Sequence, residues 1–128
     1  MGPARLGFAV AAWLFVVCLV IQIVLVGLEI FAEVGGSMHR DFAYIYGWLT
    51  PILVLLAGLA RVPTRVRSLT VVLLGLFALQ TILPSLSKQL PLLGAFHTVI
   101  ALAMFWLAVI VARRATDLVR PSRTITEG

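Results

Sequence analysis

The sequence predicts an all-α integral membrane protein, a four-helix bundle built from two parallel two-helix repeats. Of its 128 residues, 62% are hydrophobic and 12% are charged, whereas soluble domains average about half apolar and about a quarter charged residues. A chain of this length has too little interior to bury such an excess of apolar side chains in water. We therefore expect residues 1–128 to form a single transmembrane domain.

Four apolar runs are each long enough to cross a bilayer, which takes roughly 20 helical residues. The first run is uncharged until Glu29, the second and third carry no charge, and the fourth contains only His97. None of the runs alternates between polar and apolar residues, as a strand of a membrane barrel does. The predicted helices cover residues 6–31, 38–60, 69–87 and 92–113.

The connections between these runs contain residues that interrupt helices. Gly35, Gly36 and Ser37 separate the first two runs, and Pro63 lies between the second and the third. Pro91 precedes the fourth run, where it suits the first turn of a helix because its missing N–H is no loss there. The connections thus fit a chain that crosses the membrane four times.

The basic residues are divided unequally between the two ends of the predicted bundle. Only Arg40 and Lys88 fall at one end, whereas 8 arginines fall at the other. Because positive residues collect on the cytoplasmic side, we expect a multi-pass protein of the inner (plasma) membrane with both termini in the cytoplasm. The basic segment 115–128 is expected to be a disordered tail. The 8 arginines are Arg5, Arg61, Arg65, Arg67, Arg113, Arg114, Arg120 and Arg123.

The net charge of +5 does not indicate nucleic-acid binding. Nucleic-acid interfaces gather their basic residues in one patch or stripe. Here the basic residues lie at the ends of apolar runs, as in membrane proteins. No nucleic-acid partner is expected, and the bilayer is the expected surrounding of the helices.

The two halves of the chain align without a gap at an offset of 58 residues. The matched pairs of scarce residues are Gln22 with Gln80, His39 with His97, and Trp48 with Trp106. Each half contains two spans, so both halves enter the membrane in the same direction and are related by a pseudo-twofold axis along the membrane normal. This symmetry places His39 and His97, the two histidines of the chain, at equal depth near the extracytoplasmic surface.

Polar side chains accompany the histidines. Gln22 and Glu29 recur at helical spacing and share one face of the first helix, and Gln80 occupies the equivalent face of the third. Polar groups within membrane spans are costly and tend to face the bundle interior. We therefore expect the outer half of the interior to contain imidazoles and amides.

This pattern predicts a haem b site. A neutral imidazole is the commonest protein metal ligand, and haem iron accepts it axially. Two histidines on different helices at one depth suit a haem with two axial imidazoles inside a four-helix bundle. The propionates would then reach the outer surface near Arg40 or Lys88. The predicted cofactor-binding residues are His39, His97, Gln22, Gln80 and Arg40, and the predicted metal ligands are His39 and His97.

Other functions remain open at this point. A histidine near the membrane surface can be a polar interfacial residue, which would suit a cofactor-free accessory or interaction subunit. Another metal or a proton-transfer role would also use imidazoles. A transporter is the weakest alternative, because the polar groups are confined mainly to the outer half of the spans. The sequence does not decide whether the protein is an enzyme.

Two segments resemble parts of a known enzyme family. Ile21–Gly27, leading to His39 and Arg40, resembles the first helix pair of haem A synthase, and Leu79–Leu83, leading to His97, resembles its next pair. The resemblance covers residues 14–112 and one four-helix half of that two-half enzyme. The chain is also similar to small four-helix actinobacterial membrane proteins classed as a domain of unknown function.

The resemblance to haem A synthase implies that His39 and His97 ligate haem. The chain departs from that family because it has one half and lacks the extracytoplasmic loop with its cysteine pair. Synthase activity of a single chain is therefore not expected, although a homodimer would supply two halves. A haem near the outer surface would exchange electrons or haem there, with quinone or a redox partner protein as the candidate partner.

Overall fold

The computed structural model describes residues 2–120, and in this part of the chain all the regular structure is helical. Four segments are long and apolar enough to cross a membrane, with α2 and α3 together forming the second. The predicted all-α four-helix membrane fold is thus confirmed. The helices are α1 (Pro3–Phe31), α2 (Met38–Tyr46), α3 (Leu49–Leu59), α4 (Thr64–Ser87) and α5 (Leu92–Val119).

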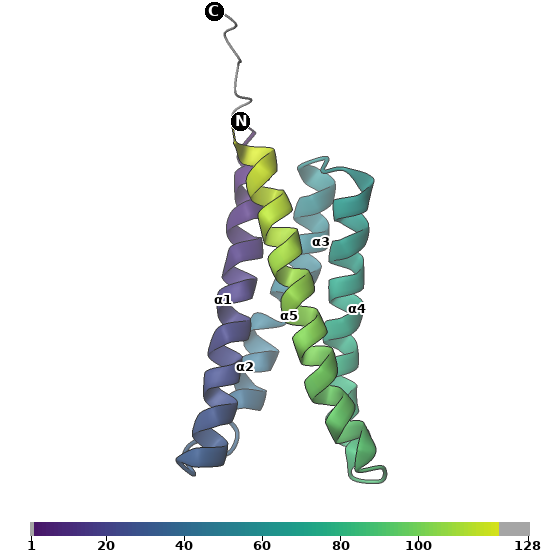
Figure 1. Cartoon of the computed structure of the whole chain (residues 1–128). Helices are drawn as coiled ribbons and strands as arrows, with labels where there is room; N and C mark the ends of the chain where they lie inside the picture. The colour runs from purple at the N-terminus through teal and green to yellow at the C-terminus, as the bar shows by residue number, and fades with distance from the viewer. Residues whose placement is uncertain (1, 121–128) are drawn as a thin grey trace, which may run out of the picture.

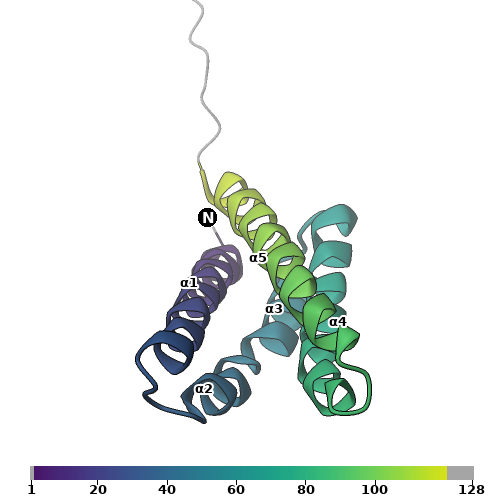
Figure 2. The ribbon, with the colours of Figure 1, turned by 60° about the horizontal axis from the view of Figure 1, so that its bottom comes forward.

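The helices run roughly along one direction, and the first described residues lie beside the last at one end of the bundle (Figure 1). We call this the terminal end. The loops α1–α2 and α4–α5 lie at the opposite end, which we call the histidine end. Toward the histidine end the pair α1–α2 diverges from the pair α4–α5, as both ribbon views show (Figures 1 and 2). Accordingly, α2 packs on α1 and has no comparable packing against α4 or α5.

The tightly packed core lies mainly in the terminal half of the bundle. Large side chains such as Phe8, Phe15 and Leu73 are fully buried there. Small residues such as Ala57 and Ala112 are also buried, and small residues let membrane helices approach closely. The histidine half contributes few residues to this core, so its helices are held together less tightly.

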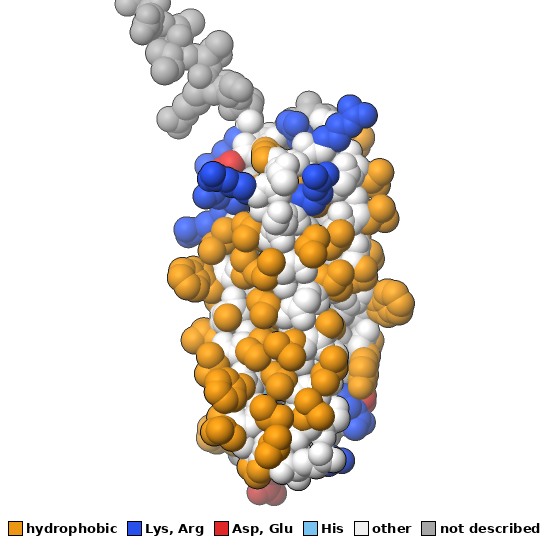
Figure 3. Space-filling view, turned by 90° about the vertical axis from the view of Figure 1, so that its right-hand side faces the viewer, with side chains coloured by type: hydrophobic (Ala, Val, Ile, Leu, Met, Phe, Trp, Pro, Cys, Tyr) orange, Lys and Arg blue, Asp and Glu red, His pale blue; other side chains and the backbone are white. Residues whose placement is uncertain are grey.

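The outer surface is a broad apolar band with a basic margin. Many large hydrophobic side chains are exposed along all the helices, which is compatible with contact with a lipid bilayer. Lys and Arg side chains gather at the terminal end above this band, and fewer lie at the other end (Figure 3). The arginines of the terminal end are Arg5, Arg61, Arg65, Arg67, Arg113, Arg114 and Arg120.

The second span is not the single helix predicted for residues 38–60, because it is broken between Tyr46 and Leu49. Pro51 has no N–H to donate to the carbonyl of Gly47, four residues before it. That carbonyl instead accepts hydrogen bonds from the Thr50 N–H (3.0 Å) and the Thr50 hydroxyl (2.8 Å). Because of this break, α2, which carries His39, runs in a different direction from α3.

Three helices extend beyond their predicted ends at the terminal end, and the first of them begins at Pro3 rather than at residue 6. The third span begins at Thr64 rather than at residue 69, and the last ends at Val119 rather than at residue 113. The added turns carry arginines, whose long side chains can reach the bilayer surface while the backbone stays helical. The predicted disordered tail 115–128 therefore begins inside a helix, and its part from 121 to 128 lies outside the described residues.

Candidate functional site

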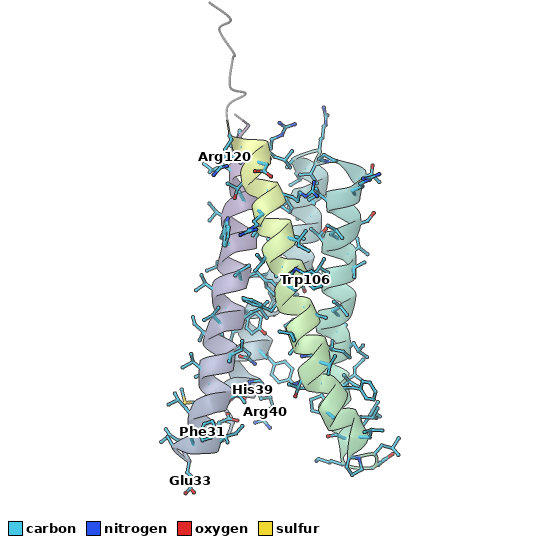
Figure 4. The ribbon with its side chains drawn as sticks, in the orientation of Figure 1. Phe31, Glu33, His39, Arg40, Trp106 and Arg120 are labelled. Atoms are coloured by element: carbon cyan, nitrogen blue, oxygen red, sulfur yellow. The ribbon has the colours of Figure 1, made fainter. Side chains whose placement is uncertain are left out.

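The two histidines lie near the same end of the bundle on different helix pairs. His39 is in the first turn of α2 and His97 is in the second turn of α5. Both are partly buried. His39 lies between α1 and α5 in the view of Figure 4. The structure therefore places the two histidines near the same end of the bundle, and their pairing stays a prediction.

The unpaired polar atoms of the structure gather at this site. Among the described residues, 4 buried side-chain nitrogen or oxygen atoms have no hydrogen-bond partner. An unpaired buried polar group costs about 1–3 kcal/mol, so such groups are uncommon and call for a partner. Each repeat supplies one amide oxygen and one ring nitrogen. The atoms are Gln22 Oε1, His39 Nδ1, Gln80 Oε1 and His97 Nδ1.

The backbone of His39 is held by two side chains of α1. The Gln22 Nε2 donates to the His39 carbonyl (2.8 Å), and the His39 N–H donates to Glu29 Oε1 (3.1 Å). The Glu29 carboxylate thereby satisfies an N–H in the first turn of α2, where helical N–H groups have no partner within the helix. Ser37, the residue before α2, does not cap it, because its hydroxyl bonds Asp41 Oδ2 instead (2.8 Å).

Glu29 is not among the residues predicted to bind the cofactor, yet it fixes the position of α2. The signal for it in the sequence is its helical spacing from Gln22, which places both side chains on the face of α1 that meets α2. Glu33, one turn further on, is exposed and points away from the site (Figure 4).

The second repeat holds its histidine differently. Gln80 is only 9% exposed, but it makes no hydrogen bond to His97 that matches the one from Gln22 to His39. Within α4, Pro84 cannot donate an N–H to the carbonyl of Gln80. The repeat is therefore symmetric in its residue types and asymmetric in its contacts.

Aromatic side chains lie next to the site on the side of the bundle centre. Phe42 and Tyr46 follow His39 along α2, and their ring centroids are 5.1 Å apart. The Tyr46 ring in turn contacts Phe77 of α4, with centroids 5.5 Å apart, and Phe15 of α1, with centroids 5.7 Å apart. Phe15 and Tyr46 are buried in this cluster, whereas Phe42 and Phe77 are only partly buried.

The predicted cofactor partner Arg40 is at the surface of the histidine end. Its side chain is 67% exposed, and its Nε lies 3.4 Å from Asp41 Oδ1. An exposed ion pair of this kind contributes little to stability. The guanidinium therefore remains free to turn toward an anionic group at the outer edge of the site (Figure 4).

The site has too few ligands for most protein metal centres. Within residues 2–120 there is no group of three or more His, Cys, Asp or Glu side chains that could hold a metal ion. Zinc sites use three or four protein ligands. Haem iron asks only for axial ligands, because the porphyrin supplies the other four nitrogens. A site with two imidazoles therefore suits haem better than zinc.

One family of proteins matches part of the chain. A family of unknown function (DUF6220) matches residues 22–86, which is just over half of the chain. The matched segment contains Gln22, His39 and Gln80, and it ends before His97. No curated protein and no solved structure matches the chain.

Proposed function

The chain belongs to a family of unknown function (DUF6220), and we propose that it binds one haem b between His39 and His97. The observation that carries this proposal is that, within residues 2–120, the buried side-chain atoms without a hydrogen-bond partner belong to the two histidines and their repeat-related glutamines. Two imidazoles from different helix pairs could ligate haem iron, each through one ring nitrogen, while the other ring nitrogen bonds a neighbouring side chain.

The surroundings of the histidines fit the rest of a haem. The helix pairs diverge at this end (Figure 2), and the buried core is concentrated in the other half. A porphyrin bound at the histidine end would therefore leave most of that core in place. Its apolar body would contact the partly buried Phe42, and its propionates would extend toward Arg40 at the surface. A haem held in this way supplies one-electron chemistry or is itself passed on.

The proposed role is exchange of electrons or haem on the extracytoplasmic side of the plasma membrane, with quinone or a redox partner protein. The likeness to one half of haem A synthase is part of this proposal, and a homodimer would provide two such halves. The orientation is supported by the arginines gathered at the terminal end, since positive residues collect on the cytoplasmic side.

The orientation is tested by reporter fusions. Fusions after Arg67 and after Arg123 should report a cytoplasmic location, and a fusion after Gly36 should report an external one. The physical reason is the unequal division of basic residues between the two ends. A cytoplasmic signal from the fusion at Gly36 would reverse the orientation and move the histidine end to the cytoplasmic side.

A cofactor-free accessory or interaction subunit is the second candidate function. Trp106 lies midway along α5 and is 71% exposed, and Trp48 is 72% exposed. Tryptophan prefers membrane interfaces, where its N–H can find a partner. An exposed tryptophan within a span therefore favours contact with another membrane protein.

Haem content separates the two candidates. The protein should be purified from cells supplied with haem, and haem and protein should be quantified separately. We expect a ratio of one haem per chain. Purified protein that is folded and free of haem, and that does not take up added haem, would refute the proposed haem site and favour the accessory subunit.

A further inference from the structure

The two glutamines of the site are placed to do more than line it. The Gln22 Nε2 donates a hydrogen bond to the backbone carbonyl of His39. The Oε1 of the same amide group therefore also lies near His39. This oxygen and the Nδ1 of His39 are both buried and unpaired. One amide can bond both the carbonyl and the ring of the same residue, because it carries a donor and an acceptor.

The same two atom types remain unpaired in the second repeat. Gln80 Oε1 and His97 Nδ1 are buried without partners, and they are separated by 17 residues along the chain, as Gln22 and His39 are. Gln80 is 9% exposed, so water has little access to its amide. A hydrogen bond within each repeat would pair all four atoms at once.

The proton of each neutral imidazole decides whether these bonds can form. A neutral imidazole carries one N–H, on either Nδ1 or Nε2. With the proton on Nε2, the Nδ1 would be an acceptor facing an amide oxygen, which is also an acceptor. With the proton on Nδ1, the ring donates to the amide oxygen, and Nε2 keeps a free lone pair.

We infer that Gln22 and Gln80 are positioning residues that hold His39 and His97, respectively, in the Nδ1–H tautomer with Nε2 free to bind iron. In the structure neither hydrogen bond is formed, so each requires a rearrangement of the side chains. Metal-ligating histidines usually donate their second ring N–H to an oxygen in this way, which orients the ring and raises its basicity. The role of the glutamines in orienting iron ligands rests on the proposed haem site, whereas the tautomer of each histidine can be measured without haem.

The first test is nitrogen NMR of the haem-free protein labelled with ¹⁵N-histidine. The chain contains 2 histidines, so the spectrum reports these two rings alone. We expect both rings in the Nδ1–H form. Gln22→Leu should remove the preference of His39 for this form, and Gln80→Leu should remove that of His97, whereas Gln80→Glu, which keeps an acceptor oxygen, should preserve it in His97. Gln89→Leu, in the exposed loop before α5, is the matched control and should change neither ring.

The second test uses the haem-loaded protein. Gln80→Leu should weaken haem binding by about 10- to 100-fold and shift the reduction potential of the haem to more positive values, because a less basic imidazole stabilises ferric iron less. Gln80→Glu should restore tight binding. Wild-type rings in the Nε2–H form, or rings unaffected by both leucine substitutions, would overturn the inference even if haem binds. If both rings are in the Nδ1–H form but the protein never takes up haem, the glutamine contacts are supported and the haem site is refuted.

Discussion

Replacing either His39 or His97 with alanine is expected to abolish the six-coordinate, low-spin haem spectrum of the protein. In the proposed site each imidazole would ligate the iron, and the chain has no third histidine. Loss of one ligand leaves five-coordinate, high-spin iron or an empty site. The measurement is the visible absorption spectrum of each purified variant in its oxidised and reduced forms.

Controls separate ligation from folding. Thr98→Ala alters an exposed position on α5 directly beside His97, and it should leave the low-spin spectrum intact. In His39→Gly and His97→Gly, added imidazole should fill the vacated position and restore the low-spin spectrum. Single alanine variants that keep a wild-type spectrum would show that the histidines do not ligate the iron.

Replacing Gly47 with alanine is expected to destabilise the bundle by about 1–3 kcal/mol, the usual cost of overpacking. A Cβ at this position would lie 2.6 Å from Cε1 and Cζ of Phe77 and 2.9 Å from the carbonyl oxygen of Ala43. The Phe77 ring cannot easily move away, since it packs against Tyr46 and Phe15. Thermal unfolding in detergent should show a lower Tm than that of the wild-type protein.

Two further variants test this explanation. Gly58→Ala, within α3, meets no atom within 4 Å, and it should leave the stability unchanged or raise it because alanine favours helix. Phe77→Leu shortens the side chain that obstructs the new methyl group, so it should recover part of the stability lost in Gly47→Ala. Equal effects of alanine at positions 47 and 58 would contradict the packing described here.

The fold could be predicted because hydrophobicity and length decide which segments cross a membrane. The break after Tyr46 could not be predicted from hydrophobicity, because the run continues through it without a charge. Its local cause, Pro51, is visible in the sequence. A proline within a membrane helix can nevertheless be accommodated without a break, as Pro84 in α4 illustrates.

The candidate site could be predicted in part because the internal repeat links residues far apart in the sequence. It points to His39 and His97 at one end of the bundle, together with their glutamines, and the structure places unpaired atoms on all four of these residues. The contact from Glu29 to His39 depends on how α2 turns back onto α1. Periodicity in the sequence predicts that Glu29 lies on the same face of α1 as Gln22, but it does not predict which residue of α2 Glu29 contacts.

The most direct test of the haem site is electron paramagnetic resonance of the oxidised wild-type protein purified with haem. Two axial imidazoles make ferric haem low-spin, so we predict a low-spin signal that accounts for one iron per chain and disappears in His39→Ala and in His97→Ala. A high-spin signal in the wild-type protein, or folded protein without haem, would contradict ligation of one haem b by these two histidines.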